Sequence, residues 1–132
     1  MYMIICAGQP KTGSTSIQSL LAHNYDRLAA KGWLYPRSGR AEIFENSSIH
    51  FPLLHAINTK LGAPPKGQRF QRLPSLDQIV RNILDEIGRH RPHTVVISCE
   101  DFWRMGRRGW LTLAEAFPDF DRETVVFLRR QD

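Results

Sequence analysis

The chain has 132 residues, of which 42% are hydrophobic and 23% are charged. This is enough apolar material for one domain with a buried core, and the charged fraction is ordinary for a soluble protein. Lysine and arginine number 18 against 13 aspartate and glutamate residues, which gives a net charge of +5. Such a balance suits an anionic ligand such as a nucleotide, an acidic glycan or nucleic acid, although a merely basic surface would give the same total.

The cysteines and the apolar runs exclude several classes of protein. Cys6 and Cys99 both lie in apolar, strand-like runs, which indicates buried, reduced thiols rather than a disulfide framework or a metal site. No Cys/His cluster has the spacing of a zinc site, so we expect no metal. The start of the chain lacks the pattern of a signal peptide, and no apolar run is long enough to span a bilayer. We therefore expect a cytoplasmic protein without a membrane span.

Short apolar runs and helical periodicities alternate along the chain. The apolar runs predict strands buried on both faces, and apolar residues at i, i+3 and i+4 predict helices. In chain order we expect a strand over 2–7, a helix over 17–28 closed by Lys31 and Gly32, a short strand over 33–36, a helix over 50–61, an exposed basic loop over 62–74, a helix over 76–87, a strand over 94–98, a short helix that begins near 112 and ends at Pro118, and a strand over 123–128. Ser75 with Gln78, and Thr112 with Glu115, have the capping-box spacing that satisfies free N–H groups at a helix start.

This alternation predicts an α/β fold whose parallel sheet is covered by helices on both faces. We expect residues 1–132 to form a single domain. The last expected strand runs into Arg129 and ends, with the sequence, at Asp132. A parallel sheet that stops at a strand tip leaves the next element unaccounted for, so we expect the chain to be the N-terminal part of a longer domain.

The segment GQPKTGSTS, residues 8–16, connects the first expected strand to the first expected helix. Backbone N–H groups at such a helix start suit phosphate oxygens, and the lysine and hydroxyl side chains add further donors. The loop of ATPases reads G-x-x-x-x-G-K-[ST]. Gly8 and Gly13 have that separation, but Ser14 stands in the lysine position and Lys11 lies two residues before Gly13. A Gly-rich turn without a ligand is the alternative interpretation.

Ligands of α/β sheets bind beyond the carboxyl ends of the strands. Three groups are expected to meet there: the loop over 8–16, Glu100 and Asp101 after the strand over 94–98, and Arg129 and Arg130 after the last strand. We therefore expect phosphate donors, a carboxylate and an arginine to share one edge of the sheet.

Three segments of the chain resemble a known family. PKTGSTS, residues 10–16, resembles the loop with which sulfotransferases that use PAPS (3′-phosphoadenosine 5′-phosphosulfate) bind the 5′-phosphosulfate. VVFLRRQD, residues 125–132, resembles the start of the family's 3′-phosphate motif, and VVISCEDFW, residues 95–103, resembles the strand between the two. The first helix and LYP at 34–36 look most like the bacterial branch. The resemblance implies a P-loop NTPase-like three-layer sandwich and transfer of a sulfuryl group from PAPS to a hydroxyl or amine of an acceptor.

Carried over position by position, the resemblance assigns the 5′-phosphosulfate to the loop. Its ligands would be Lys11, Thr12, Gly13, Ser14, Thr15 and Ser16. Arg129 matches the 3′-phosphate arginine best, and its neighbour Arg130 is the alternative. The family's partner serine, eight residues after that arginine, would fall beyond Asp132.

Sulfuryl transfer depends on positioning and on electrostatic stabilisation of a charged transition state. Lys11 can neutralise the oxygen between sulfur and the departing phosphate, a role that needs no metal. The acceptor must lose its proton to a base within hydrogen-bond reach. Glu100 is one candidate base, because the family commonly places a catalytic His or Glu near that position; a solvated or capping carboxylate is the alternative. His50, at the start of the helix over 50–61, is the other candidate, and a surface or capping role is its alternative.

The sequence leaves the acceptor and two other functions open. The basic stretches over 66–72 and 104–110 could line a channel for an anionic acceptor or a glycan, or could be solvated loops. A P-loop nucleotide kinase or NTPase would use TVVISCED, residues 94–101, to organise magnesium, although Lys11 and Ser14 are misplaced for it. A non-catalytic nucleotide- or nucleic-acid-binding module would use only the positive charge. We do not expect nucleic acid as a partner, because the aromatic and basic residues are not interleaved as in common RNA-binding modules.

Overall fold

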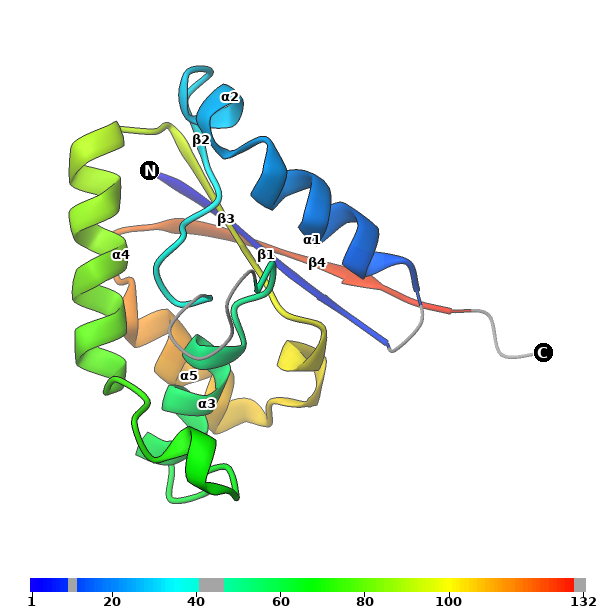
Figure 1. Cartoon of the computed structure of the whole chain (residues 1–132), viewed down its shortest axis with the longest axis vertical. Coiled ribbons are helices and arrows are strands. Elements are labelled where there is room, and N and C mark those ends of the chain that lie inside the picture. The colour runs from blue at the N-terminus through cyan, green and yellow to red at the C-terminus, as the bar shows by residue number, and fades with distance from the viewer. Residues whose placement is uncertain (10–11, 41–46, 130–132) are drawn as a thin grey trace.

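The computed structural model describes residues 1–9, 12–40 and 47–129, apart from the side chain of Arg69. Within these residues the chain forms an α/β fold around a four-stranded sheet (Figure 1). The strands are β1 (Tyr2–Gly8), β2 (Trp33–Leu34), β3 (Thr94–Ser98) and β4 (Asp121–Phe127), in the spatial order β2-β3-β1-β4. Every neighbouring pair is parallel, which confirms the expected parallel sheet.

The two central strands account for the apolar runs of the sequence. β1 pairs with β3 on one side and with β4 on the other. All five residues of β3 are buried, as are the side chains of Met3, Ile5 and Ala7 in β1. Such continuous apolar strands are typical of a parallel sheet that is covered on both faces.

The helices lie on both faces of the sheet. α1 (Ser14–His23) and α2 (Tyr25–Ala29) connect β1 to β2, α3 (Phe51–Lys60) and α4 (Leu76–His90) connect β2 to β3, and α5 (Arg107–Ala116) connects β3 to β4. Crossovers between parallel strands are right-handed, so connections that run in opposite directions across a sheet lie on opposite faces. α1 and α2 accordingly cover one face, and α3, α4 and α5 cover the other (Figure 1). Fully buried side chains of the core include Met3, Leu53, Ile57, Ile79, Ile83, Ile97, Phe102, Leu113 and Phe117.

In α4 the periodic pattern of apolar residues predicts which side chains pack into the core. Of the apolar residues at the predicted spacing, Leu76, Ile79, Ile83 and Ile87 are buried, whereas Val80 is half-buried and Leu84 is exposed. Burying each such side chain stabilises the fold by about 1.5–3 kcal/mol. Ser75 caps the helix as predicted, because its Oγ accepts from the N–H of Gln78 at 3.2 Å. The side chain of Gln78 is engaged along the helix instead: its Nε2 donates to Asn82 Oδ1 at 2.9 Å, and its Oε1 accepts from Arg81 Nη2 at 3.4 Å.

Two helices differ from the expectation. The helix expected over 17–28 is divided at Asn24, whose side-chain Nδ2 donates to a backbone carbonyl one turn earlier at 2.9 Å. Asparagine competes with the backbone in this way and favours helix ends. The helix expected to begin near Thr112 starts at Arg107, so the capping box predicted at Thr112 is wrong. Thr112 lies inside α5, and its Oγ1 donates to the carbonyl of the preceding turn at 2.9 Å.

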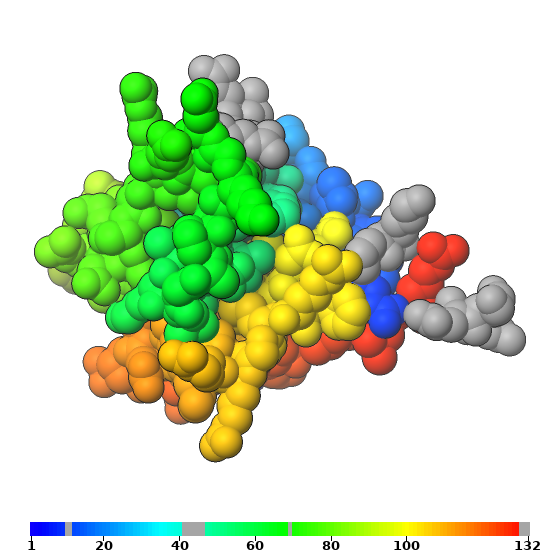
Figure 2. All heavy atoms as spheres, turned by 90° about the horizontal axis from the view of Figure 1, so that it is seen from below, coloured from blue at the N-terminus to red at the C-terminus, as the bar shows by residue number. Residues whose placement is uncertain are grey.

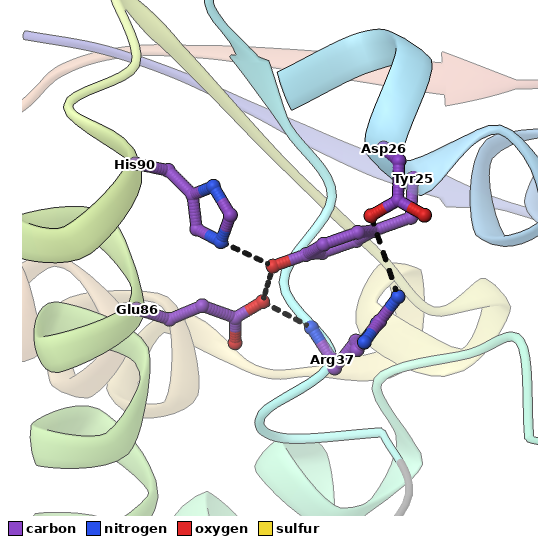
Figure 3. A network of polar contacts seen from close by, with 5 residues as sticks. All are labelled: Tyr25, Asp26, Arg37, Glu86 and His90. Atoms are coloured by element: carbon purple, nitrogen blue, oxygen red, sulfur yellow. Dashed lines mark hydrogen bonds and ion pairs between the residues drawn. The ribbon is translucent and has the colours of Figure 1, made fainter. Parts of the chain in front are cut away.

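Glu86 of α4 fastens the segment after β2 to the helices (Figure 3). Its carboxylate accepts from the Tyr25 hydroxyl at 2.6 Å and from the N–H groups of Arg37 and Ser38 at 2.9 and 3.0 Å. His90 Nε2 lies 2.9 Å from the same hydroxyl, and the Arg37 guanidinium lies 4.0 Å from the centre of the Tyr25 ring. Burial would raise the pKa of Glu86, but these hydrogen bonds outweigh it and hold the pKa below its ordinary value. Glu86 is therefore a buried, ionised residue that joins separate segments of the fold.

The two cysteines are free thiols, as predicted, with Cys99 buried and Cys6 half-buried. Burial raises the pKa of both, that of Cys99 to about 12. In the described part of the chain, no helix combines the length and apolar character needed to cross a membrane. The same residues contain no group of three or more His, Cys, Asp or Glu side chains placed to hold a metal ion.

Candidate functional site

The strand order produces a divergence at the carboxyl edge of the sheet. From β1 the chain runs towards β2, and from β3 it runs past β1 towards β4. The connections that leave these neighbouring strands head in opposite directions, and open α/β sheets bind ligands at such a point. The loop after β1 and the 3-10 helix η2 (Glu100–Arg104) flank it. In Figure 2 the yellow atoms of η2 lie between the green atoms of α3 and the blue and red atoms at the carboxyl ends of β1 and β4.

The start of the loop is packed against the end of β4. A Cβ atom on Gly8 would lie only 3.0 Å from Phe127 Cβ and 3.2 Å from the Phe127 carbonyl oxygen, so this close approach favours glycine. The N–H of Gln9 donates to the same carbonyl oxygen at 3.0 Å, and the N–H of Arg129 donates to Gln9 Oε1 at 3.2 Å. These contacts hold the exposed residue Arg129 beside the loop.

α1 begins at the end of the loop with an open N-terminus. Its N-cap residue, Gly13, has a φ of +81°, a left-handed conformation that residues with a Cβ rarely adopt. Among the described residues no side chain caps this helix start, and the first turn carries no acidic residue. The helix dipole and the N–H groups of the first turn therefore favour an anion at this point. Ser14 is buried there, whereas Thr15 and Ser16 are exposed.

The side chain of Glu100 reaches this helix start from the neighbouring strand. Glu100 is the first residue of η2, and β3 ends at Ser98. Its Oε1 accepts from Ser14 Oγ at 2.6 Å and from Thr15 Oγ1 at 3.3 Å. A separation of 2.6 Å is typical of a hydroxyl that donates to a carboxylate. Close by, Gln18 Nε2 donates to Ser98 Oγ at 2.9 Å, which anchors α1 on β3.

His50, the other candidate base, is fully buried beside β3. β2 pairs with β3 only at Thr94 and Val95, so the backbone of Ser98 needs other partners. The N–H of His50 donates to the Ser98 carbonyl oxygen at 2.8 Å, and the N–H of Ser98 donates to His50 Nδ1 at 3.1 Å. His50 Nε2 lies 3.2 Å from the Pro36 carbonyl oxygen. These partners fit a neutral ring that carries its proton on Nε2.

The surroundings of His50 keep its ring neutral. Burial, and after it the positive charge of Arg40, lower the pKa of His50 to about 3. The ring continues the hydrogen bonding of β3 beyond the end of β2, which is a structural task. No contact among the described residues links it to the loop or to Glu100. Its role as a base therefore stays a prediction, and the geometry gives it no support.

A groove opens beside η2, next to Glu100. It measures about 230 Å³ and is lined by Phe51, Leu54, His55, Asn58, Asp101, Arg104 and Met105. Asp101 Oδ1 and Arg104 Nε are 3.8 Å apart. Because Glu100 faces the loop and the next residue lines the groove, the groove and the loop are neighbours. A larger hollow of about 600 Å³ lies at the far end of α3, around Lys60 and the 3-10 helix η1 (Gln68–Phe70), away from the loop.

The remaining predicted site residues are distributed as follows. Thr12 is half-buried, and its Oγ1 donates to the Gln9 carbonyl oxygen at 3.0 Å, within the loop itself. Lys11 and Arg130 lie outside the described residues. Sequence reasoning did not single out Gln9, although its place within the loop was a signal. It also did not find the groove, because the lining residues come from two segments whose meeting no local pattern encodes.

Comparison of the chain with protein-family models, with curated proteins and with solved structures found no match.

Proposed function

We propose that the chain is a PAPS-dependent sulfotransferase of the P-loop-like class, which transfers a sulfuryl group to a hydroxyl or amine. The observation that carries the proposal is the open, uncapped start of α1 at the divergence of β1 and β3. A helix N-terminus that follows a Gly/Ser/Thr loop in this position suits a phosphate-type anion. The resemblance of PKTGSTS to the phosphosulfate loop supports PAPS as that anion.

Each element of the site has a task in this proposal. The N–H groups at the start of α1 and the hydroxyls of Ser14, Thr15 and Ser16 would hold the phosphosulfate. Lys11, placed by the sequence in the same loop, would neutralise the oxygen that leaves with the phosphate. Arg129, whose backbone N–H donates to Gln9 Oε1 beside the loop, would bind the 3′-phosphate.

Glu100 is the base that the geometry supports better. Its carboxylate lies within hydrogen-bond distance of the loop, whereas His50 is buried and engaged by backbone groups. The groove between η2 and α3 offers the acceptor an approach next to Glu100. From there Glu100 would take the proton of the acceptor hydroxyl or amine as its bond to sulfur forms. Two free cysteines fit the reducing environment of the cytoplasm, which we propose as the location.

Ligand stabilisation tests the proposal. We expect 3′,5′-ADP, the product of PAPS, to raise the midpoint of thermal unfolding without magnesium, since a ligand at a hundred times its Kd stabilises a fold by about 2.7 kcal/mol. Lys11→Ala should abolish sulfuryl transfer from PAPS to a panel of alcohols, phenols, amines and glycans, while the fold remains intact. Lys31→Ala, at an exposed position after α2, is the matched control and should behave like the wild type. Normal transfer by Lys11→Ala would refute the mechanism.

One contact favours a second candidate, a magnesium-dependent nucleotide kinase or NTPase. Thr15 occupies the [ST] position of the ATPase loop, and its Oγ1 lies 3.3 Å from the Glu100 carboxylate. In that class a hydroxyl and a carboxylate in this relation organise magnesium. The same thermal titration distinguishes the two candidates. Stabilisation by ATP only when magnesium is present, with no response to 3′,5′-ADP, would favour the kinase or NTPase.

A further inference from the structure

Glu100 places a carboxylate where the proposed function requires an anionic ligand. Ser14 Oγ donates to Glu100 Oε1 at 2.6 Å, and Thr15 Oγ1 donates to the same oxygen at 3.3 Å. Ser14 is only 4% exposed, so water contributes little to its hydrogen bonding. The first turn of α1 has no acidic residue of its own. Glu100 therefore supplies, from η2 just beyond the end of β3, the negative charge that a helix start favours.

The hydroxyl of Ser14 cannot serve two anions at once. A serine hydroxyl has a single hydrogen to donate. While Ser14 donates it to Glu100, it cannot donate it to a phosphate or sulfate oxygen. A carboxylate and a phosphate at the same helix start also repel each other. The observed position of Glu100 and an anion held by Ser14 therefore exclude each other.

We propose that Glu100 is an internal occupant of the loop, and that an incoming phosphate-type anion displaces its carboxylate and takes over the Ser14 hydroxyl. The identity of the natural anion rests on the proposed function, but the exchange requires only a loop that binds phosphate. Once displaced, the carboxylate is free to turn towards the adjoining groove between η2 and α3. The base then becomes available to the acceptor only after the phosphosulfate is in place, so the donor binds before the acceptor.

The exchange is tested with inorganic pyrophosphate, which needs the loop but no adenosine site. Its Kd is measured by calorimetry at constant pH and ionic strength for the wild type, Glu100→Gln and Asp101→Asn. Glu100→Gln removes the competing charge at constant size, and we expect it to bind pyrophosphate about tenfold more tightly, which is about 1.4 kcal/mol. Asp101→Asn is the matched control, because the Asp101 carboxylate lies one residue further and pairs with Arg104. The Kd of this control for pyrophosphate should lie within about twofold of the wild-type value.

The Ser14→Ala variant distinguishes the exchange of the Ser14 hydroxyl from a general repulsion between the Glu100 carboxylate and the anion. In this background the Ser14 hydroxyl is gone and only the longer contact from Thr15 Oγ1, at 3.3 Å, remains, so Glu100→Gln should improve binding by less than about threefold. A tenfold gain that persists without Ser14, or an equal gain from Asp101→Asn, would overturn the exchange. Unchanged or weaker binding by Glu100→Gln alone, or no pyrophosphate binding by any variant, would overturn it as well.

Failure of the proposed function has a different signature. In that case the pyrophosphate affinities of the variants would be as expected, but 3′,5′-ADP would bind no more tightly than pyrophosphate and no sulfuryl group would be transferred from PAPS. That combination would refute the sulfotransferase and leave the exchange between Glu100 and a phosphate-type anion standing.

Discussion

His50 makes the stability of the fold depend on pH. Its Nδ1 accepts from the N–H of Ser98 at 3.1 Å, which requires a neutral ring. Burial and the charge of Arg40 lower the pKa of His50 from its ordinary value of 6.5 to about 3. In the unfolded chain the same side chain takes up a proton near pH 6.5. Because the unfolded state then binds more protons, the stabilisation is complete above that pH and is lost as the pH falls towards 3.

The magnitude follows from the two pKa values. A difference of one bound proton changes the free energy of unfolding by about 1.4 kcal/mol per pH unit. Between about pH 7.5 and pH 5 the expected loss is about 2 kcal/mol. Glu86 acts at lower pH, because its pKa lies below the ordinary 4.5 and its stabilisation is lost only as the pH falls through that range. The window from pH 7.5 to pH 5 therefore reports on His50.

Urea unfolding at several pH values within this window measures the effect. His50→Asn does not titrate but keeps an oxygen that can accept from the Ser98 N–H. We expect this variant to be less stable than the wild type at pH 7.5, because it loses the contact with Pro36, and to show little further loss down to pH 5. His23→Asn, at an exposed position in α1, is the control and should keep the pH dependence of the wild type.

NMR of the histidine ring nitrogens provides a second measurement that does not depend on a variant. The His50 ring should keep its proton on Nε2 and should not titrate between about pH 7.5 and pH 5. A ring that titrates near pH 6.5, or a wild type whose stability is constant across the window, would refute the assignment of a neutral, structural histidine.

Two further changes probe the fold and the loop. Glu86→Gln should lower the free energy of unfolding in urea by about 2–3 kcal/mol, because charge-assisted hydrogen bonds to Tyr25 and two backbone N–H groups are lost. Tyr25→Phe should lower it by only about 1 kcal/mol. An equal loss in both variants would contradict the role of the Glu86 charge. Gly13→Ala should destabilise the fold by about 1–2 kcal/mol, since its φ of +81° is strained for alanine although nothing lies within 4 Å of the added Cβ. Gly88→Ala, inside α4 and equally unobstructed, should stabilise the fold by about 0.5–1 kcal/mol. If both variants changed the stability in the same direction, the left-handed conformation of Gly13 would not be the cause.

The sequence predicted those parts of the fold that depend on local patterns. The apolar runs of β1 and β3 and the periodic stripe of α4 follow from burial of successive or regularly spaced side chains, which a short segment reveals. The Ser75 cap was likewise visible, since its partner lies three residues away. The capping-box pattern at Thr112 predicted a wrong helix start, because a threonine hydroxyl inside a helix can donate to the preceding turn as readily as it can cap the start of a new helix.

The candidate site likewise has parts that local patterns predicted and parts that they did not. The Gly/Ser/Thr spacing of residues 8–16 identified the loop, because a left-handed glycine and hydroxyl donors at a helix start are local requirements. The sequence placed Glu100 near the loop but did not reveal that Ser14 holds its carboxylate. These two residues lie 86 positions apart, and the parallel pairing of β1 with β3 brings them together.

The sequence alone therefore determined the α/β alternation, the loop and the carboxylate that follows β3, because each rests on contacts within a few residues. Only the tertiary structure decided which groups His50 and Glu100 contact. His50 contacts the end of β3 and Glu100 follows that end, and their partners depend on the order and register of the strands. β2 ends early and leaves the backbone of Ser98 to a buried histidine, while the neighbouring β1 directs Ser14 towards Glu100. Local propensity cannot encode such partners, since they come from segments that meet only when the sheet has formed.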